Sequence, residues 1–217
     1  MRGMSERRTR VYDRDHVRDF FAARAADWDR RFPDDGPAFA AAVAVMGLRP
    51  GDRVLDAGCG TGRALPALRE AVGPTGVVLG VDLTEAMLRE AVRSGRDRDG
   101  ALLLADAAAP PLRAASLDAV FAAGLVAHLP APGRDLAALG RAVRPGGVLA
   151  LFHPVGRAAL AARQGRELTA NDLRALPNLR PLLAAAGWRL TAYVDEPSRF
   201  LALAVREAVP EGPDALY

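Results

Sequence analysis

Residues 54–62 read VLDAGCGTG, a short apolar run that passes directly into three closely spaced glycines. An apolar run of this length is typical of a strand that is buried on both faces of a sheet. Gly58, Gly60 and Gly62 leave the following loop short of side chains, so a ligand can lie against the backbone and face the N–H groups of the next helix. The segment therefore predicts a strand, a ligand-binding loop and a helix, in that order.

The pattern of apolar run, loop and amphipathic helix repeats along the chain. Further short apolar runs lie at 77–81, 101–105, 119–122 and 148–152. Helical stretches around 64–72, 85–94 and 134–143 separate most of these runs. This alternation predicts a parallel sheet with helices on both faces, joined by right-handed crossovers.

The C-terminal part has a different pattern. Residues 172–186 read as a helix, and residues 188–194 and 200–205 read as strands with a turn at 196–198 between them. Two strands joined so tightly must be antiparallel. We therefore expect an α/β fold with a Rossmann-like, doubly wound, seven-stranded and mostly parallel sheet that ends in a C-terminal antiparallel hairpin. The chain has no linker long enough to separate a second domain.

The distribution of charge argues against a nucleic-acid partner. The formal net charge of +3, from 29 basic and 26 acidic residues, equals the local excess within residues 1–10, where four arginines face one glutamate. The rest of the chain is neutral on balance, whereas nucleic-acid binders usually spread a basic footprint over a folded face. We therefore read the basic terminus as a solvated tail.

Hydropathy and cysteine content bear on the compartment. The longest apolar runs, such as 38–45 and 158–162, fall well short of the roughly 20 residues needed to span a bilayer, so we expect no membrane partner. The single cysteine, Cys59, excludes an intrachain disulfide and a thiolate zinc cage, which suits a reducing compartment. The chain is therefore expected to be cytoplasmic and to hold no metal. Its oligomeric state is not indicated.

The glycine spacing bears on the kind of nucleotide ligand. A dinucleotide-binding loop has the spacing G-x-G-x-x-G, which would place a glycine where this chain has Arg63. This departure weakens the prediction of a nucleotide-cofactor oxidoreductase, which stays as an alternative.

A second signal is Asp82, which ends the second apolar run 22 positions beyond Gly60. A carboxylate there can accept hydrogen bonds from both hydroxyls of a ribose. An aspartate that caps the following helix would give the same pattern, so only the combination with the glycine loop is informative.

The order of these motifs resembles that of the class I S-adenosylmethionine-dependent methyltransferases of small-molecule type. The segments that carry the resemblance are 54–62, 80–83, 104–107, 117–121 and 144–149. Five motifs in the family's order are specific, whereas any one of them alone would not be.

The resemblance implies that S-adenosyl-L-methionine is the cofactor and that each motif binds one part of it. Asp56, Ala57, Gly58 and Gly60 would line the methionine part, Asp82 the ribose, Leu83, Asp106 and Ala107 the adenine, and Ala123 and Gly124 the sulfonium and amino end. Methyl transfer is an in-line displacement, so alignment and exclusion of water can supply much of the acceleration.

Two histidines are candidate catalytic residues. His128 and His153 follow the fourth and fifth expected strands, where the acceptor should lie. Either could take a proton from the acceptor at neutral pH, if the acceptor must lose one. The alternative is that both are loop histidines with ordinary hydrogen bonds.

The N-terminal part, residues 1–48, resembles the helical lid that many small-molecule methyltransferases place over the cofactor, with residues 49–217 as the cofactor-binding domain. Residues 13–48 predict two helices, broken at 33–37. Tyr12 and Trp28 are candidates for closing over the site, although aromatic residues at helical spacing also serve as core.

Only residues 156–175 are left to form an acceptor pocket, which favours a small-molecule acceptor that the sequence does not identify. Arg157, Arg163 and Arg166 in this segment have the charge to attract an acidic substrate, but the pattern favours a solvated arginine face. A protein that binds S-adenosylmethionine without catalysis, and serves as a partner, stays as a further alternative.

Overall fold

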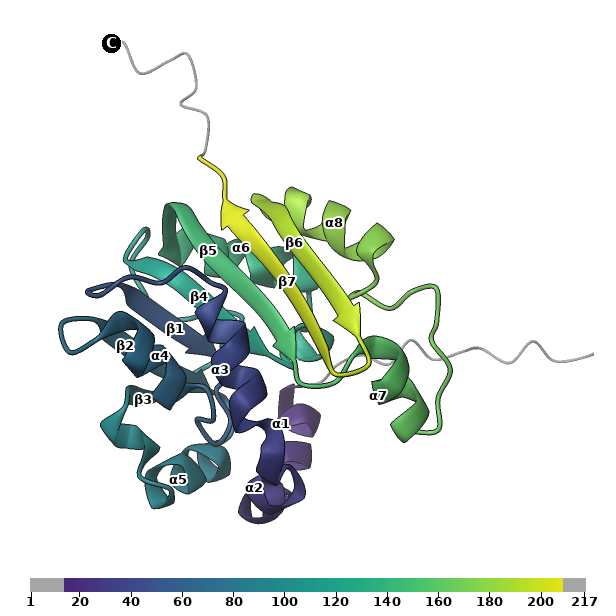
Figure 1. The fold of residues 1–217 in the computed structure, drawn as a ribbon, viewed down its shortest axis with the longest axis horizontal. Coiled ribbons are helices and arrows are strands. Elements are labelled where there is room, and N and C mark those ends of the chain that lie inside the picture. The colour runs from purple at the N-terminus through teal and green to yellow at the C-terminus, as the bar shows by residue number, and fades with distance from the viewer. Residues whose placement is uncertain (1–13, 209–217) are drawn as a thin grey trace, which may run out of the picture.

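A computed structural model describes residues 14–208, so the basic residues of 1–10 and Tyr12 lie outside the described part of the chain. Seven strands form one sheet in the order β3-β2-β1-β4-β5-β7-β6 (Figure 1). Their bounds are β1 (Arg53–Ala57), β2 (Val77–Asp82), β3 (Ala101–Leu104), β4 (Leu117–Ala123), β5 (Val143–His153), β6 (Trp188–Glu196) and β7 (Arg199–Arg206). The first five strands are parallel, and β7 pairs antiparallel with both β5 and β6. The predicted α/β fold is confirmed.

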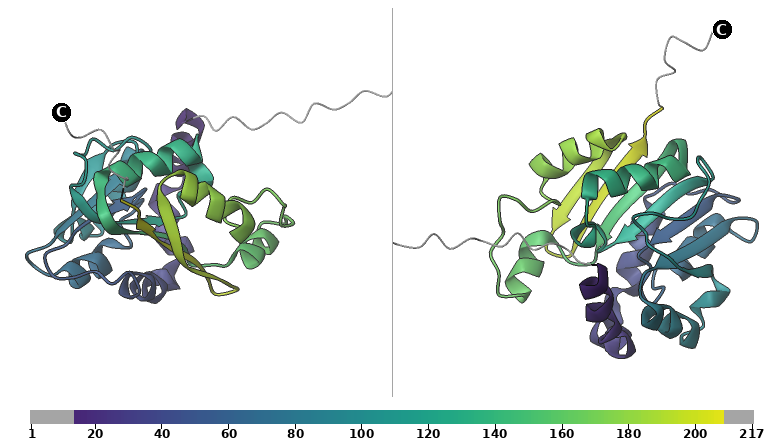
Figure 2. Two further views of the ribbon diagram at one scale, coloured as in Figure 1. Left: turned by 90° about the horizontal axis from the view of Figure 1, so that it is seen from above. Right: turned by 180° about the vertical axis from the view of Figure 1, so that it is seen from behind.

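Helices cover both faces of the sheet, as the views in Figure 2 show. They are α1 (Arg14–Ala22), α2 (Trp28–Arg31), α3 (Gly36–Ala44), α4 (Leu65–Val72), α5 (Glu85–Arg93), α6 (Pro132–Ala142), α7 (Arg157–Arg163) and α8 (Leu176–Ala185). One core contains Leu136 of α6 and Leu179 of α8, and the other contains Phe39 of α3 and Leu68 of α4. The sheet is therefore buried on both faces, which explains its nearly continuous apolar strands.

The N-terminal helices differ from the prediction of two. The first splits into α1, a 3-10 turn at Ala25–Asp27, and α2, while α3 begins at Gly36, just after the 3-10 turn at Pro33–Asp35. The bend before α2 lets the Phe21 and Trp28 rings meet at a centroid distance of 5.5 Å. The single predicted helix is therefore interrupted at the point where these two aromatic rings come into contact.

Two further differences lie after β5. Helix α7 was not predicted, and α8 begins at Leu176 rather than at 172. The Asp172 carboxylate accepts a hydrogen bond from the backbone N–H of Arg174 at 2.9 Å, which favours a turn over a helix at that point. Pro177 then stands in the first turn of α8, where a proline is tolerated.

The carboxyl ends of β1, β2, β4 and β5 open on one side of the molecule, toward α1, α2 and α7 (Figure 1). The loops that follow parallel strands meet on this side, which is where open α/β sheets bind ligands. In the described part of the chain, no helix has both the length and the apolar character needed to cross a bilayer.

Candidate active site

A cavity of about 870 Å³ lies at the carboxyl ends of the parallel strands. The loops after all five parallel strands line it together with α1, α2 and the segment that contains α7. This volume is within the range of about 300–1,000 Å³ that is common for pockets that bind small molecules and cofactors.

The glycine loop after β1 forms one wall. Gly58, Gly60 and Gly62 have φ values of +70°, +56° and +77°, a region that favours glycine. A Cβ atom on Gly60 would meet nothing within 4 Å, whereas one on Gly62 would lie 2.9 Å from Cδ1 of Leu65. Gly60 therefore presents bare backbone beside the cavity, while Gly62 allows the close packing of α4.

Asp56, near the end of β1, is a buried acid that lines the cavity. Only 1% of the residue is exposed, and its Cα pairs with Gly80 of β2 and Phe121 of β4. Burial, and then the charge of Asp82, raise the pKa of this carboxyl from 3.8 to about 8. A cation bound in the cavity would favour its ionised form.

Asp82, at the end of β2, connects two loops. Its Oδ2 accepts a hydrogen bond from the Gly60 N–H at 2.8 Å, and its Oδ1 accepts one from the Thr84 N–H at 2.7 Å. The N-cap residue of α5 is Thr84, so Asp82 does not cap this helix, and its bond to the Thr84 N–H closes a turn ahead of it. The same side chain also lines the cavity. Burial raises the pKa of Asp82, against the effect of these hydrogen bonds.

The residues expected around adenine also line the cavity, namely Leu83, Asp106 and Ala107. Asp106 Oδ1 accepts a hydrogen bond from the Ala108 N–H at 2.8 Å, and its Oδ2 forms an ion pair with Arg14 of α1 at 2.7 Å. This carboxylate therefore links the end of β3 to the N-terminal helix.

Of three further residues predicted to bind the cofactor, two line the cavity and one lies in the core. Ala123 and Gly124, at the end of β4, line the cavity. Ala57 is fully buried in the core between the sheet and α6 and α8, and is not among the lining residues.

The two candidate catalytic histidines come together at the cavity. His128 ends the 3-10 turn Val126–His128, and its ring lies edge-on to that of Phe21 at 5.1 Å between centroids. His153 ends β5, with Nδ1 at 2.8 Å from the carbonyl oxygen and 3.0 Å from the backbone nitrogen of Val155. Burial lowers the pKa of both imidazoles, and the charge of Arg174 lowers both further. For His153, the hydrogen bond with Val155 and the charge of Asp35 oppose this effect without reversing it. Both rings are therefore neutral at pH 7.

The N-terminal helices are joined to the glycine loop by polar contacts. Asp29 of α2 accepts a hydrogen bond from the Thr61 hydroxyl at 2.6 Å and forms an ion pair with Arg96, also at 2.6 Å. Arg63 forms an ion pair with Asp35 at 3.2 Å. Trp28 lines the cavity between the rings of Phe21 and Phe32.

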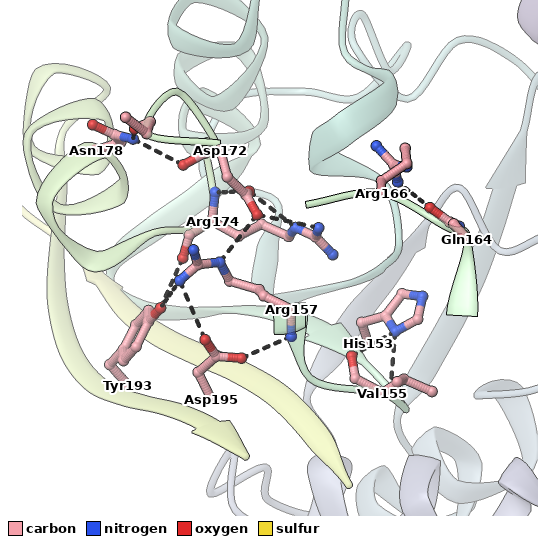
Figure 3. A network of polar contacts seen from close by, with 11 residues as sticks. His153, Val155, Arg157, Gln164, Arg166, Asp172, Arg174, Asn178, Tyr193 and Asp195 are labelled. Carbon is pink, nitrogen blue, oxygen red and sulfur yellow. Dashed lines mark hydrogen bonds and ion pairs between the residues drawn. The ribbon is translucent and has the colours of Figure 1, made fainter. Parts of the chain in front are cut away.

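On the β5 side of the cavity, a polar network joins the α7 segment to the β6–β7 hairpin (Figure 3). Arg157, with a side chain only 12% exposed, forms ion pairs with Asp172 at 3.1 Å and with Asp195 at 3.2 Å. The expectation of a solvated arginine face was therefore wrong for Arg157, although Arg163 and Arg166 are exposed. Arg174 belongs to this network and was missed, because nothing in the local sequence sets it apart.

Two other side chains with reactive groups, Cys59 and Asp118, lie in surroundings typical of a structural role. Burial raises the pKa of the Cys59 thiol well above its ordinary value, which keeps it protonated and weakly nucleophilic. Asp118 accepts hydrogen bonds from the Arg53 N–H at 2.8 Å and from Arg144 at 2.6 Å, and it lies outside the cavity lining. Between residues 14 and 208, no group of three or more His, Cys, Asp or Glu side chains could hold a metal ion.

Proteins of similar sequence include methyltransferases. Residues 54–147 match the family described as "Methyltransferase domain". The chain is 37% identical over 110 residues to nocamycin O-methyltransferase of Saccharothrix syringae, a match that covers 49% of this chain and 39% of that protein. It is 37% identical over 111 residues to aklanonic acid methyltransferase DauC of Streptomyces sp. strain C5, with 50% of each covered. The matches thus span at most half the length of these curated relatives.

Solved structures share the fold at lower identity. The magnesium protoporphyrin IX methyltransferase of Synechocystis PCC 6803, solved with bound S-adenosylhomocysteine, superposes with a TM-score of 0.69 and 19% identity. That superposition covers 89% of this chain and 99% of the other.

Proposed function

Because the chain belongs to the class I S-adenosylmethionine-dependent methyltransferase family, we propose that it transfers a methyl group from S-adenosyl-L-methionine to a small-molecule acceptor. The observation that carries this proposal is the row of three carboxylates beside bare glycine backbone. Asp56, Asp82 and Asp106 stand at or just after the ends of β1, β2 and β3, and all three line the cavity that Gly60 leaves open.

The charges of these residues fit the cofactor. S-adenosylmethionine carries an ammonium and a sulfonium, and Asp56 is a buried acid that a neighbouring cation would ionise. Each carboxylate oxygen has two lone pairs, so Asp82 can accept ribose hydroxyls in addition to its two backbone N–H donors. Leu83, Asp106 and Ala107 are proposed to hold the adenine.

The remaining predicted residues are given roles by their position. Ala123 and Gly124 are proposed to lie under the sulfonium and the amino end. Ala57 is proposed to act only by supporting the loop from the core, since the residue is fully buried.

The bound cofactor supplies a methyl group on a sulfonium, which a nucleophile displaces in line. The protein's part is to align the acceptor and to exclude water, and α1 and α2 are proposed as the lid that does so. His128 or His153 would take a proton from an acceptor that must lose one, since both imidazoles are neutral at pH 7. For His153 this requires that Nδ1–H donate to the Val155 carbonyl, which leaves Nε2 free to accept.

A turnover assay tests the proposal. The protein would be incubated with S-adenosylmethionine labelled in the methyl group and with a panel of small phenols, carboxylic acids and amines. We expect at least one acceptor to gain the label while S-adenosylhomocysteine forms in equal amount. Binding of the cofactor without transfer to any acceptor would instead favour a non-catalytic partner protein.

A further inference from the structure

The β5 side of the cavity combines apolar walls with a positive charge. Val155, Leu160, Leu168 and Leu173 line it, and Arg174 joins them from the segment before α8. A surface of this composition suits a small molecule with an apolar body and one polar anchor.

The backbone of Arg174 is fixed from two sides. Its N–H donates to Oδ1 of Asp172 at 2.9 Å, and its carbonyl accepts a hydrogen bond from the Tyr193 hydroxyl of β6 at 2.9 Å. The guanidinium lies 6.0 Å from the ring centroid of Phe200, and the side chain is only 16% exposed. Arg174 is therefore held in place before any ligand binds.

The guanidinium still has hydrogen-bonding capacity. Its Nε and Nη2 lie 3.3 and 3.4 Å from the oxygens of Asp172, long for a charge-assisted pair. Arg157 shares the same carboxylate, with Nε at 3.1 Å. Among the described residues, Nη1 of Arg174 has no hydrogen-bond acceptor. In Figure 3, the guanidinium extends from the network toward the side where His153 lies.

The charges around this side are positive on balance. In the segment between β5 and α8, Arg163, Arg166 and Arg174 line the cavity against Glu167 and Asp172, an excess of one positive charge. Asp35 also acts on His153, but it forms an ion pair with Arg63. The charge of Arg174 also lowers the pKa of both His128 and His153, so its field reaches both rings. An anionic group would therefore be attracted to the part of the cavity beside the histidines.

We infer that Arg174 binds a carboxylate of the methyl acceptor, and hence that the acceptor is a small acid with an apolar body. The planar guanidinium matches a carboxylate through paired N–H donors, which a neutral amide cannot accept equally well. This inference rests on the proposed function, because it takes the β5 side of the cavity as the acceptor subsite.

The test compares acids with their neutral amides. Benzoate, salicylate and 3-phenylpropionate, and the three corresponding amides, would be titrated into protein saturated with S-adenosylhomocysteine. We expect at least one acid to bind about tenfold more tightly than its amide, as befits a hydrogen bond to a charged group. In Arg174→Gln this preference should fall to near unity.

Two variants control for folding and for general charge. Arg174→Lys keeps a cation beside Asp172 and should retain the fold and part of the preference for acids. Arg180→Gln removes an exposed arginine of α8 and should leave the preference unchanged. If Arg174 served only to neutralise Asp172, the preference for acids over amides would persist in Arg174→Gln, and this result would overturn the inference.

The outcomes separate this inference from the proposed function. Equal affinity for acids and amides, or no binding of any acid while S-adenosylhomocysteine binds, would overturn the carboxylate subsite. The proposed methyltransferase function would not be affected by either result. A separate titration measures binding of S-adenosylhomocysteine itself. If it detects none while acids still bind through Arg174, the anion site is upheld and the methyltransferase is overturned.

Discussion

At the scale of single residues, Asp56 shows how the fold changes the chemistry of one side chain. The β1 strand carries it between β2 and β4, where little water reaches it and where Asp82 adds a second negative charge. An ordinary aspartate is thereby turned into an acid that holds its proton at neutral pH until a cation arrives.

The pH dependence of stability tests this description of Asp56. Between pH 3.8 and about 8 the folded protein holds a proton that the unfolded chain has released. Raising the pH through this range therefore lowers the free energy of unfolding, by about 1.4 kcal/mol per pH unit for one group, and the loss ends above pH 8.

Denaturant melts of the wild type and of Asp56→Asn, without cofactor, would measure the effect. We expect the variant to lose less stability than the wild type between pH 5 and pH 8, because asparagine does not titrate. Parallel curves for the two proteins over this range would contradict the raised pKa of Asp56.

Two of the three loop glycines, Gly60 and Gly62, should respond differently to the same substitution. Gly60→Ala adds a methyl group that meets no protein atom but faces the cavity, so we expect cofactor affinity to fall at least about tenfold. Its positive φ should cost only about 1 kcal/mol of stability.

Gly62→Ala has the same backbone strain and adds a contact of 2.9 Å with Leu65. We expect it to lower the melting temperature more than Gly60→Ala does. Calorimetric titration and thermal melts of both variants give the two readouts, and the reverse ranking of melting temperatures would show that the roles are misassigned.

At the scale of elements, α1 and α2 depend on contacts with distant parts of the chain. Helix α1 has no buried residue, yet Arg14 reaches Asp106 beyond β3, and Phe21 reaches His128 beyond β4. These helices have little apolar burial of their own, so their position over the cavity depends on side-chain pairs.

The Asp29 contacts allow a test of the lid. Asp29→Asn weakens the ion pair with Arg96 and should make α2 open more readily, so we expect the cofactor to dissociate about 3–10 times faster. The matched control is Asp27→Asn, which removes an exposed ion pair with Arg30 on the same turn. Stopped-flow displacement of the cofactor measures both rates, and equal rates in the two variants would argue against a lid held by Asp29.

Elements with a strong local pattern were predictable, and those set by distant contacts were not. Strands β1, β2 and β5 are apolar runs between loops, and buried parallel strands leave that signature in the sequence. Helix α7 is short, and Gly156 before it packs against the backbone of Glu196, a residue 40 positions later.

The same distinction holds within the site. Asp56 and Asp82 lie in motifs with characteristic spacing, so the sequence was enough to single them out. Arg174 lies in no motif, and it becomes notable only because Asp172, Tyr193 and Phe200 converge on it. Its role depends on the β6–β7 hairpin, which local sequence does not connect to the cavity.

At the scale of the whole molecule, the parallel half of the sheet and the C-terminal hairpin meet at one cavity. The glycine loop and the three carboxylates line the side of β1, β2 and β3, and the hairpin supports Arg174 on the side of β5. The β4 and β5 loops, with His128 and His153, lie between them. This arrangement can bring a cofactor and an acceptor together at the two histidines.

Calorimetric titration with S-adenosylmethionine, S-adenosylhomocysteine, NADH and NADPH in parallel tests the central claim most directly. We predict saturable binding of the first two ligands alone, and an affinity weaker by about 1.5–3 kcal/mol in Asp82→Ala, which loses a charge-assisted hydrogen bond to the ribose. Binding of a nicotinamide nucleotide, or of none of the four, would contradict the assignment of the cofactor.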